Sequence, residues 1–507
     1  MRAEAVFWLV WLIAITALFF VLSALAFRAW TRWAERARGH VSHVLPRTGP
    51  PTPMDALADR IGPGTGALGL TGGREAFAAR LQSIRMAGRS IDLMYYIWRN
   101  DLTGSLLLAE LMRAADRGVR VRLLLDDINA QGFGRTLLAL NQHPGVEIRL
   151  FNPTRSRGHI LRRTTEMLLG LSRFNRRMHG KMWVVDGQLA IIGGRNIGDT
   201  YFEALAGGER NSRDIDAAVT GPVLREVEGC FDSFWNLGLS LPVLTLWPKA
   251  RVSPRAFRRR LYRKTRSDAA RAFVARLPHG VLDRPFHTGG QARLIADPPE
   301  KAYGHRTSPW IVDRLPQILN EVDRDLRLVT PYFVPGMEGG RILTALAERG
   351  VRVEMLTNAL CSTDKVVVFG AYGRYRHRLL RAGVRMFEYA PPPRSDGRRD
   401  LLHTKLFVMD GRRTLIGSVN YDMRSAFMNT ELGLLLDDPA LVAEMNREFE
   451  RITSPAQAYQ LVAAGRRHRF LVSRPGLPKE MRADPEAGPA LRALSWIAGQ
   501  LPIQYWL

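Results

Sequence analysis

The chain opens with an uninterrupted apolar stretch. Ala5 to Phe27 is a run of 23 residues without one charged side chain, rich in Leu, Phe, Val, Ile and Trp. As a helix, a run of that length spans a hydrocarbon core of about 30 Å. It lacks the basic start and the small-residue exit of a cleaved signal peptide, because Arg2 is offset by Glu4 and Arg28-Ala29-Trp30 follows the run. The pattern predicts an uncleaved membrane anchor with a single span.

Basic residues directly after this run indicate the orientation of the anchor. Arg28, Arg32, Arg36 and Arg38 follow it, and Glu35 is the only acidic residue among them. Cytoplasmic flanks of membrane spans are enriched in Lys and Arg. We therefore expect the body of the protein to lie in the cytoplasm.

The body alternates between short apolar strands and amphipathic helices, and it does so twice. The first series is a strand at 91–97, a helix at 104–117 and a strand at 119–125. The second is a strand at 326–333 and a helix ending near Arg349, after which Arg349-Gly350-Val351-Arg352-Val353 echoes Arg117-Gly118-Val119-Arg120-Val121. Strands that alternate with helices predict parallel sheets in βαβ units, with helices on both faces. The expected fold is α/β, with two similar halves fused in one chain.

Composition indicates where these parts meet. Pro46 to Gly66 holds five prolines and several glycines. Because both residue types disfavour helix and sheet, we expect a linker there. The expected units are an anchor at 1–45, the linker at 46–66, a first half at 67–245, a basic connecting segment at 246–300 and a second half at 301–507.

Charge narrows the choice of partners. The 507 residues carry a formal net charge of +25, which attracts polyanions such as nucleic acids or anionic lipid headgroups. Lys249 to Arg266 holds nine basic residues in 18, and forms either a solvated helix face or a patch on phosphates or anionic lipid. Because the chain has a predicted anchor, anionic phospholipids and the membrane surface are the expected partners.

The two cysteines, Cys230 and Cys361, form no CxxC or Cys/His cluster, which argues against a disulfide framework or a zinc site.

Two matching motifs carry the candidate chemistry. His179-Gly180-Lys181 is followed by Asp186, and His403-Thr404-Lys405 by Asp410, with identical spacing. Gly193 and Gly417, and likewise Asn196 and Asn420, are separated by the same 224 residues as the two histidines. Coincidence would have to reproduce this whole register inside repeated halves. We therefore expect both motifs to contribute to one site.

The residue types suit phosphoryl chemistry. Residues i and i+2 of a strand share a face, so each motif presents an imidazole beside an ammonium. Two facing pairs supply a nucleophile, a general acid and two cations, Lys181 and Lys405, for the phosphate oxygens. Asn196 and Asn420 can donate to the same oxygens. No carboxylate cluster with metal-binding spacing accompanies the motifs, so neither a metal nor another cofactor is expected.

Four carboxylates are expected to support the site. Each histidine needs a partner that fixes its tautomer, and Asp214 and Glu431 are the candidates, since each precedes a proline, Pro222 or Pro439, by the same interval. Asp186 and Asp410 are each followed by Gly, and we expect them to hold a turn and its backbone donors, organising the catalytic motif instead of reacting. The aromatic residues Tyr95, Tyr96, Tyr332 and Phe333 are expected mainly in the strand core.

The paired HxK(x)4D motifs, with the Gly193–Asp199 and Gly417–Asn420 stretches after them, resemble the phospholipase D superfamily. The segments 95–98, 123–127 and 175–179 are similar to those of bacterial cardiolipin synthases, especially cardiolipin synthase C. The resemblance implies two fused phospholipase D-like βαβ halves with a pseudo-twofold active site, and a bacterial inner membrane location. It also implies two-step transfer through a covalent phosphohistidine, with His179 as nucleophile and His403 as acid and then base.

Several alternatives stay open. Phosphatidylglycerol as acceptor implies cardiolipin as product, whereas water implies phosphatidic acid, and the sequence alone does not fix which histidine is the nucleophile. A superfamily nuclease uses the same motifs, but the anchor argues against it, and no nucleic-acid partner is expected. A noncatalytic membrane scaffold has no need of two intact His-Lys pairs. The oligomeric state stays unknown.

Overall fold

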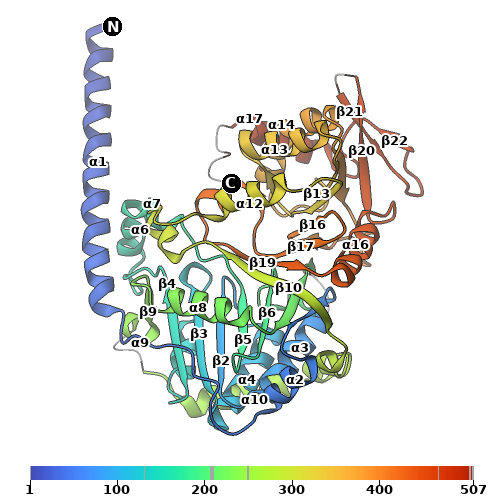
Figure 1. Cartoon of the computed structure of the whole chain (residues 1–507). Helices are drawn as coiled ribbons and strands as arrows, with labels where there is room; N and C mark the ends of the chain where they lie inside the picture. Colours follow the sequence, from blue (N-terminus) through green and yellow to red (C-terminus); the bar gives the residue numbers. More distant parts are fainter. Residues whose placement is uncertain are drawn as a thin grey trace.

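One long helix stands beside a two-part body in the computed structural model, which describes residues 2–130, 132–205, 210–247, 251–465, 467–501 and 504 (Figure 1). Helix α1 (Arg2–Ala37) holds the one candidate membrane span of the described residues, Val6–Ala37. None of the residues in the apolar window of this span is buried. Near its C-terminal end, Trp30 and Ala34 are buried against the body, and Trp30 Nε1 donates to the Pro153 carbonyl over 3.2 Å. The expected apolar helix is thus present and docked through its last turns.

The first half is a mixed sheet with the strand order β9-β4-β3-β2-β5-β6-β8-β1. Its strands are β1 (Thr65–Leu70), β2 (Ser90–Tyr95), β3 (Arg120–Asp126), β4 (Val146–Phe151), β5 (Met182–Val185), β6 (Leu189–Gly193), β8 (Asp216–Thr220) and β9 (Ser240–Pro242). Its helices are α2 (Pro53–Ile61), α3 (Gly73–Met86), α4 (Leu102–Asp116), α5 (Gly134–Leu140), α6 (Ile160–Leu169), α7 (Leu171–Phe174), α8 (Leu224–Trp235) and α9 (Val243–Leu246).

The second half repeats this arrangement in the order β10-β19-β17-β16-β11-β13-β14-β20-β21-β22. Its strands are β10 (His287–Ala296), β11 (Asp325–Val329), β13 (Arg352–Asn358), β14 (Arg385–Tyr389), β16 (Leu406–Met409), β17 (Arg413–Gly417), β19 (Leu432–Asp437), β20 (Ala458–Ala464), β21 (Arg467–Leu471) and β22 (Glu480–Met481). Its helices are α12 (Ile311–Asn320), α13 (Gly336–Glu348), α14 (Val366–Arg381), α15 (Met423–Phe427), α16 (Pro439–Thr453) and α17 (Pro489–Gln500).

The expected parallel pairing is found in only part of each sheet. Strands β2, β3 and β4 are parallel, as are β11, β13 and β14, because a helix crosses between each consecutive pair. The strands after the motif histidines, β5 and β16, pair antiparallel with β6 and β17, since short turns join them. The predicted parallel βαβ pairing is therefore found in the parallel strands, whereas the motif strands add antiparallel pairs that it did not include.

Strand β10 joins the two sheets (Figure 1). Its first residues pair with β1 of the first half, and Gln291 to Ala296 pair with β19 of the second. Around this junction a single hydrophobic cluster includes side chains of both halves, such as Phe231 and Val185 from the first and Leu434 and Met445 from the second. The two halves therefore share a core instead of meeting through a flexible joint.

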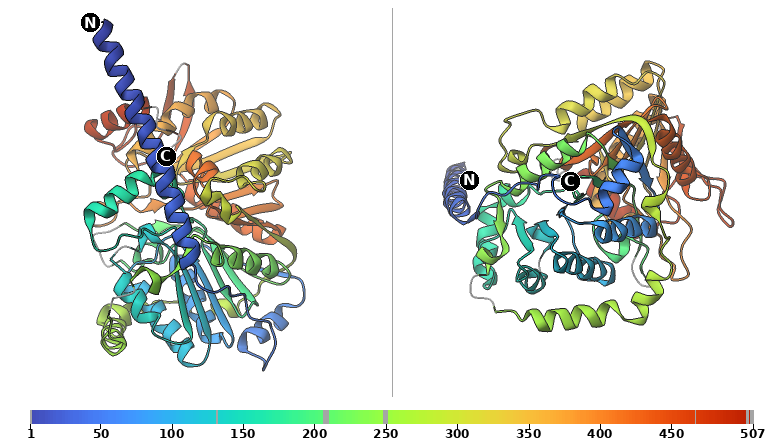
Figure 2. Two further views of the ribbon diagram at one scale, coloured as in Figure 1. Left: turned by 90° about the vertical axis from the view of Figure 1, so that its left-hand side faces the viewer. Right: turned by 60° about the horizontal axis from the view of Figure 1, so that its bottom comes forward.

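Two segments differ from the picture that composition gave. Within the expected linker, residues 53–61 form helix α2, because Thr52 and Asp55 make a capping box and Pro53 sits in the first turn, where its missing N–H is not needed. Helix α10 (Pro254–Thr265) and helix α11 (Asp268–Val274) lie in the basic connecting segment at 246–300, in which Lys249 falls outside the described residues. Figure 2 shows α10 on the outer surface of the first half, and most of its arginines are exposed.

Candidate active site

Both motif histidines lie in extended segments just before the strands β5 and β16, and each is held by the other half. The His179 amide donates to the Thr430 carbonyl over 2.9 Å, and the His403 amide donates to the Arg213 carbonyl over 2.8 Å. The short strands β7 (Ser212–Arg213) and β15 (Leu401–Leu402) pair across the same joint. This reciprocal pairing brings the two motifs together at one place.

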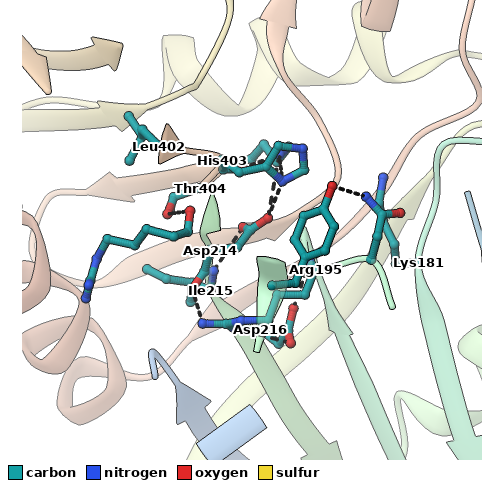
Figure 3. Close-up of polar contacts among 12 residues, drawn as sticks. Lys181, Arg195, Asp214, Ile215, Asp216, Leu402, His403 and Thr404 are labelled. Carbon is teal, nitrogen blue, oxygen red and sulfur yellow. Dashed lines mark hydrogen bonds and ion pairs between the residues drawn. The ribbon is translucent and has the colours of Figure 1, made fainter. Parts of the chain in front are cut away.

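The carboxylate partners of the histidines are exchanged between the halves. His179 Nδ1 lies 2.8 Å from Glu431 Oε2, and His403 Nδ1 lies 2.5 Å from Asp214 Oδ2. Figure 3 shows Asp214 pointing toward His403. Sequence reasoning found both carboxylates but left open which histidine each one serves. The structure pairs each histidine with the carboxylate that follows the other motif.

The surroundings of Glu431 keep it ionised. Ser418 and Ser425 donate their hydroxyls to it over 2.5 and 2.8 Å. Burial opposes ionisation, but the contacts with His179, Lys181 and Ser418 hold the pKa of Glu431 well below its usual range. A fixed carboxylate at Nδ1 leaves Nε2 as the free nitrogen of His179.

Burial shapes the basicity of the motif residues. Desolvation, assisted by the charges of Lys181 and Lys405, lowers the pKa of His179 to about 4 even though Glu431 acts in the opposite direction. Burial and the Lys405 charge also lower the pKa of His403, and burial lowers the pKa of Lys181 to about 7. The charge of each motif's lysine thus also lowers the pKa of the other motif's histidine. His179 is a neutral imidazole at neutral pH.

The histidines open into one pocket of about 890 Å³, which residues from both halves line. Its wall holds His179, His403, Asn196 and Asn420. Cationic side chains surround it, namely Arg99, Arg210, Lys365, Arg398 and Arg424, against the two carboxylates of Asp364 and Asp422. This excess of positive charge suits an anionic group such as a phosphodiester.

The lysines sit behind the histidines and do not line the pocket wall. Lys181 and Lys405 are each 1% exposed. Lys181 Nζ donates to the His179 carbonyl over 2.5 Å, and Lys405 Nζ lies 2.9 Å from His403 Nδ1 and 3.7 Å from Asp214. Their charges act on the pocket from beneath it, and contact between either ammonium and a phosphate stays a prediction.

The two asparagines differ in their contacts. Asn196 accepts from the Ile97 amide and donates to the Tyr201 hydroxyl, both over 3.1 Å. In Asn420, which is 7% exposed, the side-chain oxygen has no hydrogen-bond partner in the described part of the chain. Both asparagines line the pocket, and the side chain of Asn196 is held in place by its contacts with Ile97 and Tyr201.

Comparison with known proteins identifies this arrangement. Residues 81–235 and 315–453 match the family described as cardiolipin synthase, PLD-like domain. The chain belongs to this family. It is 36% identical over 398 residues to cardiolipin synthase C of Escherichia coli K12, a match that covers 74% of this chain and 82% of that protein. It is 29% identical over 398 residues to a cardiolipin synthase of Geobacillus sp. WCH70, covering 76% of this chain and 66% of the relative.

Among solved structures, the fold is similar to phosphatidylserine synthase of Haemophilus influenzae Rd KW20. The TM-score is 0.54 at 16% identity, with 79% of this chain and 90% of that chain covered. The expected fold class, two phospholipase D-like halves with an N-terminal apolar helix, is confirmed. Membership in the cardiolipin synthase family also makes this protein a phospholipid-modifying enzyme of the phospholipase D type.

In this family member, aromatic side chains contribute more to the site than the sequence suggested. The Tyr96 ring lies 4.9 Å from the His179 ring, and the Tyr201 ring lies 5.3 Å from the His403 ring. Tyr332 also lines the pocket, whereas Tyr95 and Phe333 lie in the core as expected. Tyr201 was not predicted because it lies in a 3₁₀ helix of only three residues (Asp199–Tyr201), which has no periodic pattern, although the Gly193–Asp199 stretch marks that region.

The last residues of the two motifs lie away from the pocket. Asp186 and Asp410 follow strands β5 and β16, at the opposite end from the histidines. Asp186 accepts the amides of Gly88, Arg89 and Ser90 over 2.7–2.8 Å. Asp410 likewise accepts the amides of residues 323–325. The donors belong to the segments that lead into β2 and β11 and not to the turns that Asp186 and Asp410 begin, where both residues have positive φ angles, 52° and 55°.

Metal ligands were not expected at this site. Within the described ranges, no group of three or more His, Cys, Asp or Glu side chains is placed to hold a metal ion. Cys230 and Cys361 are free thiols, and burial raises their pKa to about 12 and about 11. The expectation of metal-independent catalysis stays a prediction for experiment.

Proposed function

We propose that this protein transfers a phosphatidyl group through a covalent phosphohistidine, making cardiolipin from phosphatidylglycerol and a second phospholipid. The observation that carries the proposal is a cation-lined pocket with two histidines, each steadied by a carboxylate of the opposite half. The relatives named cardiolipin synthase support the choice of substrate class. Hydrolysis to phosphatidic acid is the second candidate, and nucleic-acid hydrolysis a more distant one.

In the first step, His179 Nε2 attacks the phosphatidyl phosphorus. The new P–N bond forms as the P–O bond to the headgroup alcohol breaks, and the leaving oxygen takes a proton from protonated His403. Two features of the site support these roles. The lowered pKa of His179 keeps its lone pair available, and Asp214 stabilises the positive form of His403 against the burial that lowers its pKa.

In the second step, the acceptor hydroxyl attacks the phosphorus and gives its proton to His403. The P–N bond breaks and neutral His179 is restored. Lys181 and Lys405 beneath the pocket, with Asn196 and Asn420 in its wall, would stabilise the charge on the phosphate oxygens in both transition states. The acceptor decides the product, since a hydroxyl of phosphatidylglycerol gives cardiolipin and water gives phosphatidic acid.

Membrane association fits the same function. The apolar helix α1 supplies a candidate span, and the net charge of +25 favours anionic lipid surfaces. From Arg28, Arg32, Arg36 and Arg38 we propose a cytoplasmic body at a bacterial inner membrane. A protease-protection assay on sealed vesicles of known orientation tests this proposal.

The direct test is to incubate the purified full-length chain with labelled phosphatidylglycerol, with and without phosphatidylethanolamine, and to resolve the lipids. We expect cardiolipin, undiminished by EDTA, and none from His179→Ala. Phosphatidic acid as the sole product would favour hydrolysis, and cleavage of DNA without lipid conversion would favour the nuclease. A requirement for added metal would contradict the mechanism.

A further inference from the structure

A second cavity, a groove of about 640 Å³, lies in the second half beside the catalytic pocket. Helices α12, α13 and α15 form its sides, and residues 419–423 form the wall next to the catalytic pocket. Its lining is mostly apolar and includes Ile311, Leu315, Leu319, Met337, Ile342 and Val419. Met337 is 75% exposed and Phe427 is 38% exposed. Open apolar surface of this kind, in a concave site, indicates a ligand with an apolar part.

The groove and the catalytic pocket share two lining residues, Asn420 and Asp422. Both follow the second motif on the segment that leads into α15, and Tyr421 and Asp422 form the short strand β18, paired with β12 (Phe333–Val334). The two cavities therefore meet at this segment. For one molecule to occupy both, with a phosphate at the histidines and an apolar tail in the groove, the tail has to pass over Asn420 and Asp422.

We propose that the groove holds one acyl chain of a diacyl phospholipid whose phosphate lies between His179 and His403. The inference rests on the proposed function and specifies how that site recognises its substrate. Polarity supports a lipid occupant, since the catalytic pocket is rich in cations and the groove is apolar. A peptide segment would bring backbone amides that need hydrogen-bond partners along its whole length, whereas Asn420, Asp422 and Ser425 lie on the one lining segment, 419–427, and the other charged side chains are Glu338, Arg341 and Arg378.

An acyl chain in the groove predicts a dependence on chain length. Each methylene transferred from water to an apolar site strengthens binding about fourfold. For phosphatidylglycerols short enough to stay monomeric, KM of the full-length chain in detergent-free buffer should fall by about this factor per added methylene, with little change in kcat.

Two groove variants test the assignment. Met337→Asp places a charge at the exposed mouth, where folding tolerates it, and Ile342→Trp fills the groove. Both should abolish the dependence of KM on chain length while leaving the shortest lipid unaffected. The matched control is Leu494→Asp on α17, an apolar side chain that is 53% exposed and outside the groove, which should keep the wild-type dependence.

Three outcomes would overturn the proposal. The first is a dependence of KM on chain length that is unchanged in both groove variants. The second is a rise in KM that is equal for the shortest and the longest lipid. The third is a dimer of the wild type that Met337→Asp dissociates without altering the dependence of KM on chain length. The last result would assign the groove to a second copy of the chain.

A photolabelling arm separates this inference from the proposed function. In full-length His179→Ala, a phosphatidylglycerol with a diazirine near the acyl terminus should label α12 or α13, and Met337→Asp should reduce that label. Labelling elsewhere would contradict the groove assignment whatever the reaction is. Failure of the wild type to convert any phospholipid would instead contradict the proposed function.

Discussion

At the scale of single residues, the site depends on carboxylates that cross between the halves. Glu431 is bonded to His179 and to two serines, and Asp214 is bonded to His403. We predict that Glu431→Gln and Asp214→Asn each lower kcat by about 10²- to 10⁴-fold, because the neutral amide no longer fixes the tautomer or stabilises the imidazolium. Steady-state kinetics with phosphatidylglycerol measure this, and an unchanged kcat in either variant would show that the contact has no catalytic role.

The crossed pairing also predicts which histidine each variant affects. Glu431→Gln should lower the pKa of His179 further, since the carboxylate that raises it is lost, and should leave His403 nearly unchanged. NMR titration of the histidine rings in Glu431→Gln and Asp214→Asn measures which histidine pKa each substitution changes. The uncrossed result, in which Glu431→Gln acts on His403, would refute the geometry.

The pH dependence of kcat/KM follows from burial of the motif residues. As pH falls toward about 4, His179 takes up a proton and loses its nucleophilic lone pair, so activity should decline on the acid side. As pH rises, the protonated form of His403 that the first step needs is lost, because burial lowers the pKa of His403, and near pH 7 Lys181 also loses its proton, so activity should decline on the alkaline side too. A rate that rises steadily up to pH 9 or so would contradict this role of Lys181.

Asp186 and Asp410 provide a matched pair for stability. Asp186 is 3% exposed, whereas the contacts of Asp410 with residues 323 and 324 lie at the surface. Removing a buried acceptor leaves its amide donors unpaired at a cost of about 1–3 kcal/mol. Asp186→Ala should therefore lower Tm more than Asp410→Ala, and Asp186→Asn should recover part of the loss. Equal Tm values for the two alanine variants would be inconsistent with this difference in burial.

At the scale of elements, helix α1 has two roles that a truncation can separate. Its apolar part is exposed, whereas Trp30 docks on the body beneath the Arg173 guanidinium, 3.8 Å from the ring centre. A chain that begins at Arg28 should leave the membrane fraction and keep its Tm, because the docked turn is retained. Trp30→Ala in the full chain should stay with the membrane but lose about 3–5 kcal/mol of stability. Retention of the truncated chain on salt-washed membranes would show that another element anchors it.

The elements also show how far sequence patterns reach. The strands β2, β3, β11 and β13 and the helices α4 and α13 were predictable because buried strands and amphipathic helices have distinct periods. The antiparallel pairing of the motif strands was not, since pairing direction depends on the connections and not on the residues of the strand. Helix α2 was missed because prolines and glycines outweighed the capping pattern of Thr52 and Asp55.

At the candidate site, the repeated register located the histidines, lysines, asparagines and carboxylates. It did not reveal that Asp214 pairs with His403 and Glu431 with His179, because spacing along the chain does not show which residues of one half face the other half. Ser418 and Tyr201 were not found either, since a single hydroxyl has no pattern of its own. Such contacts join residues far apart in the sequence, and they depend on how the two halves pack against each other.

At the scale of the whole molecule, the two halves form one structural unit around a shared pocket. They share the strand β10, a common hydrophobic core and one pocket, and each supplies the partner of the other's histidine. This differs from a tandem of two independent enzymes, in which each half would hold a complete site. Loss of either motif should therefore remove the whole activity.

The rate of cardiolipin formation by His179→Ala, His403→Ala and the double variant tests this claim most directly. If the two motifs form one site, each single variant should fall by at least about 10³-fold, and the double variant should fall no further. Equal expression and Tm of the three proteins are the control for folding. A substantial rate that survives in either single variant, and disappears only in the double variant, would contradict a single shared site.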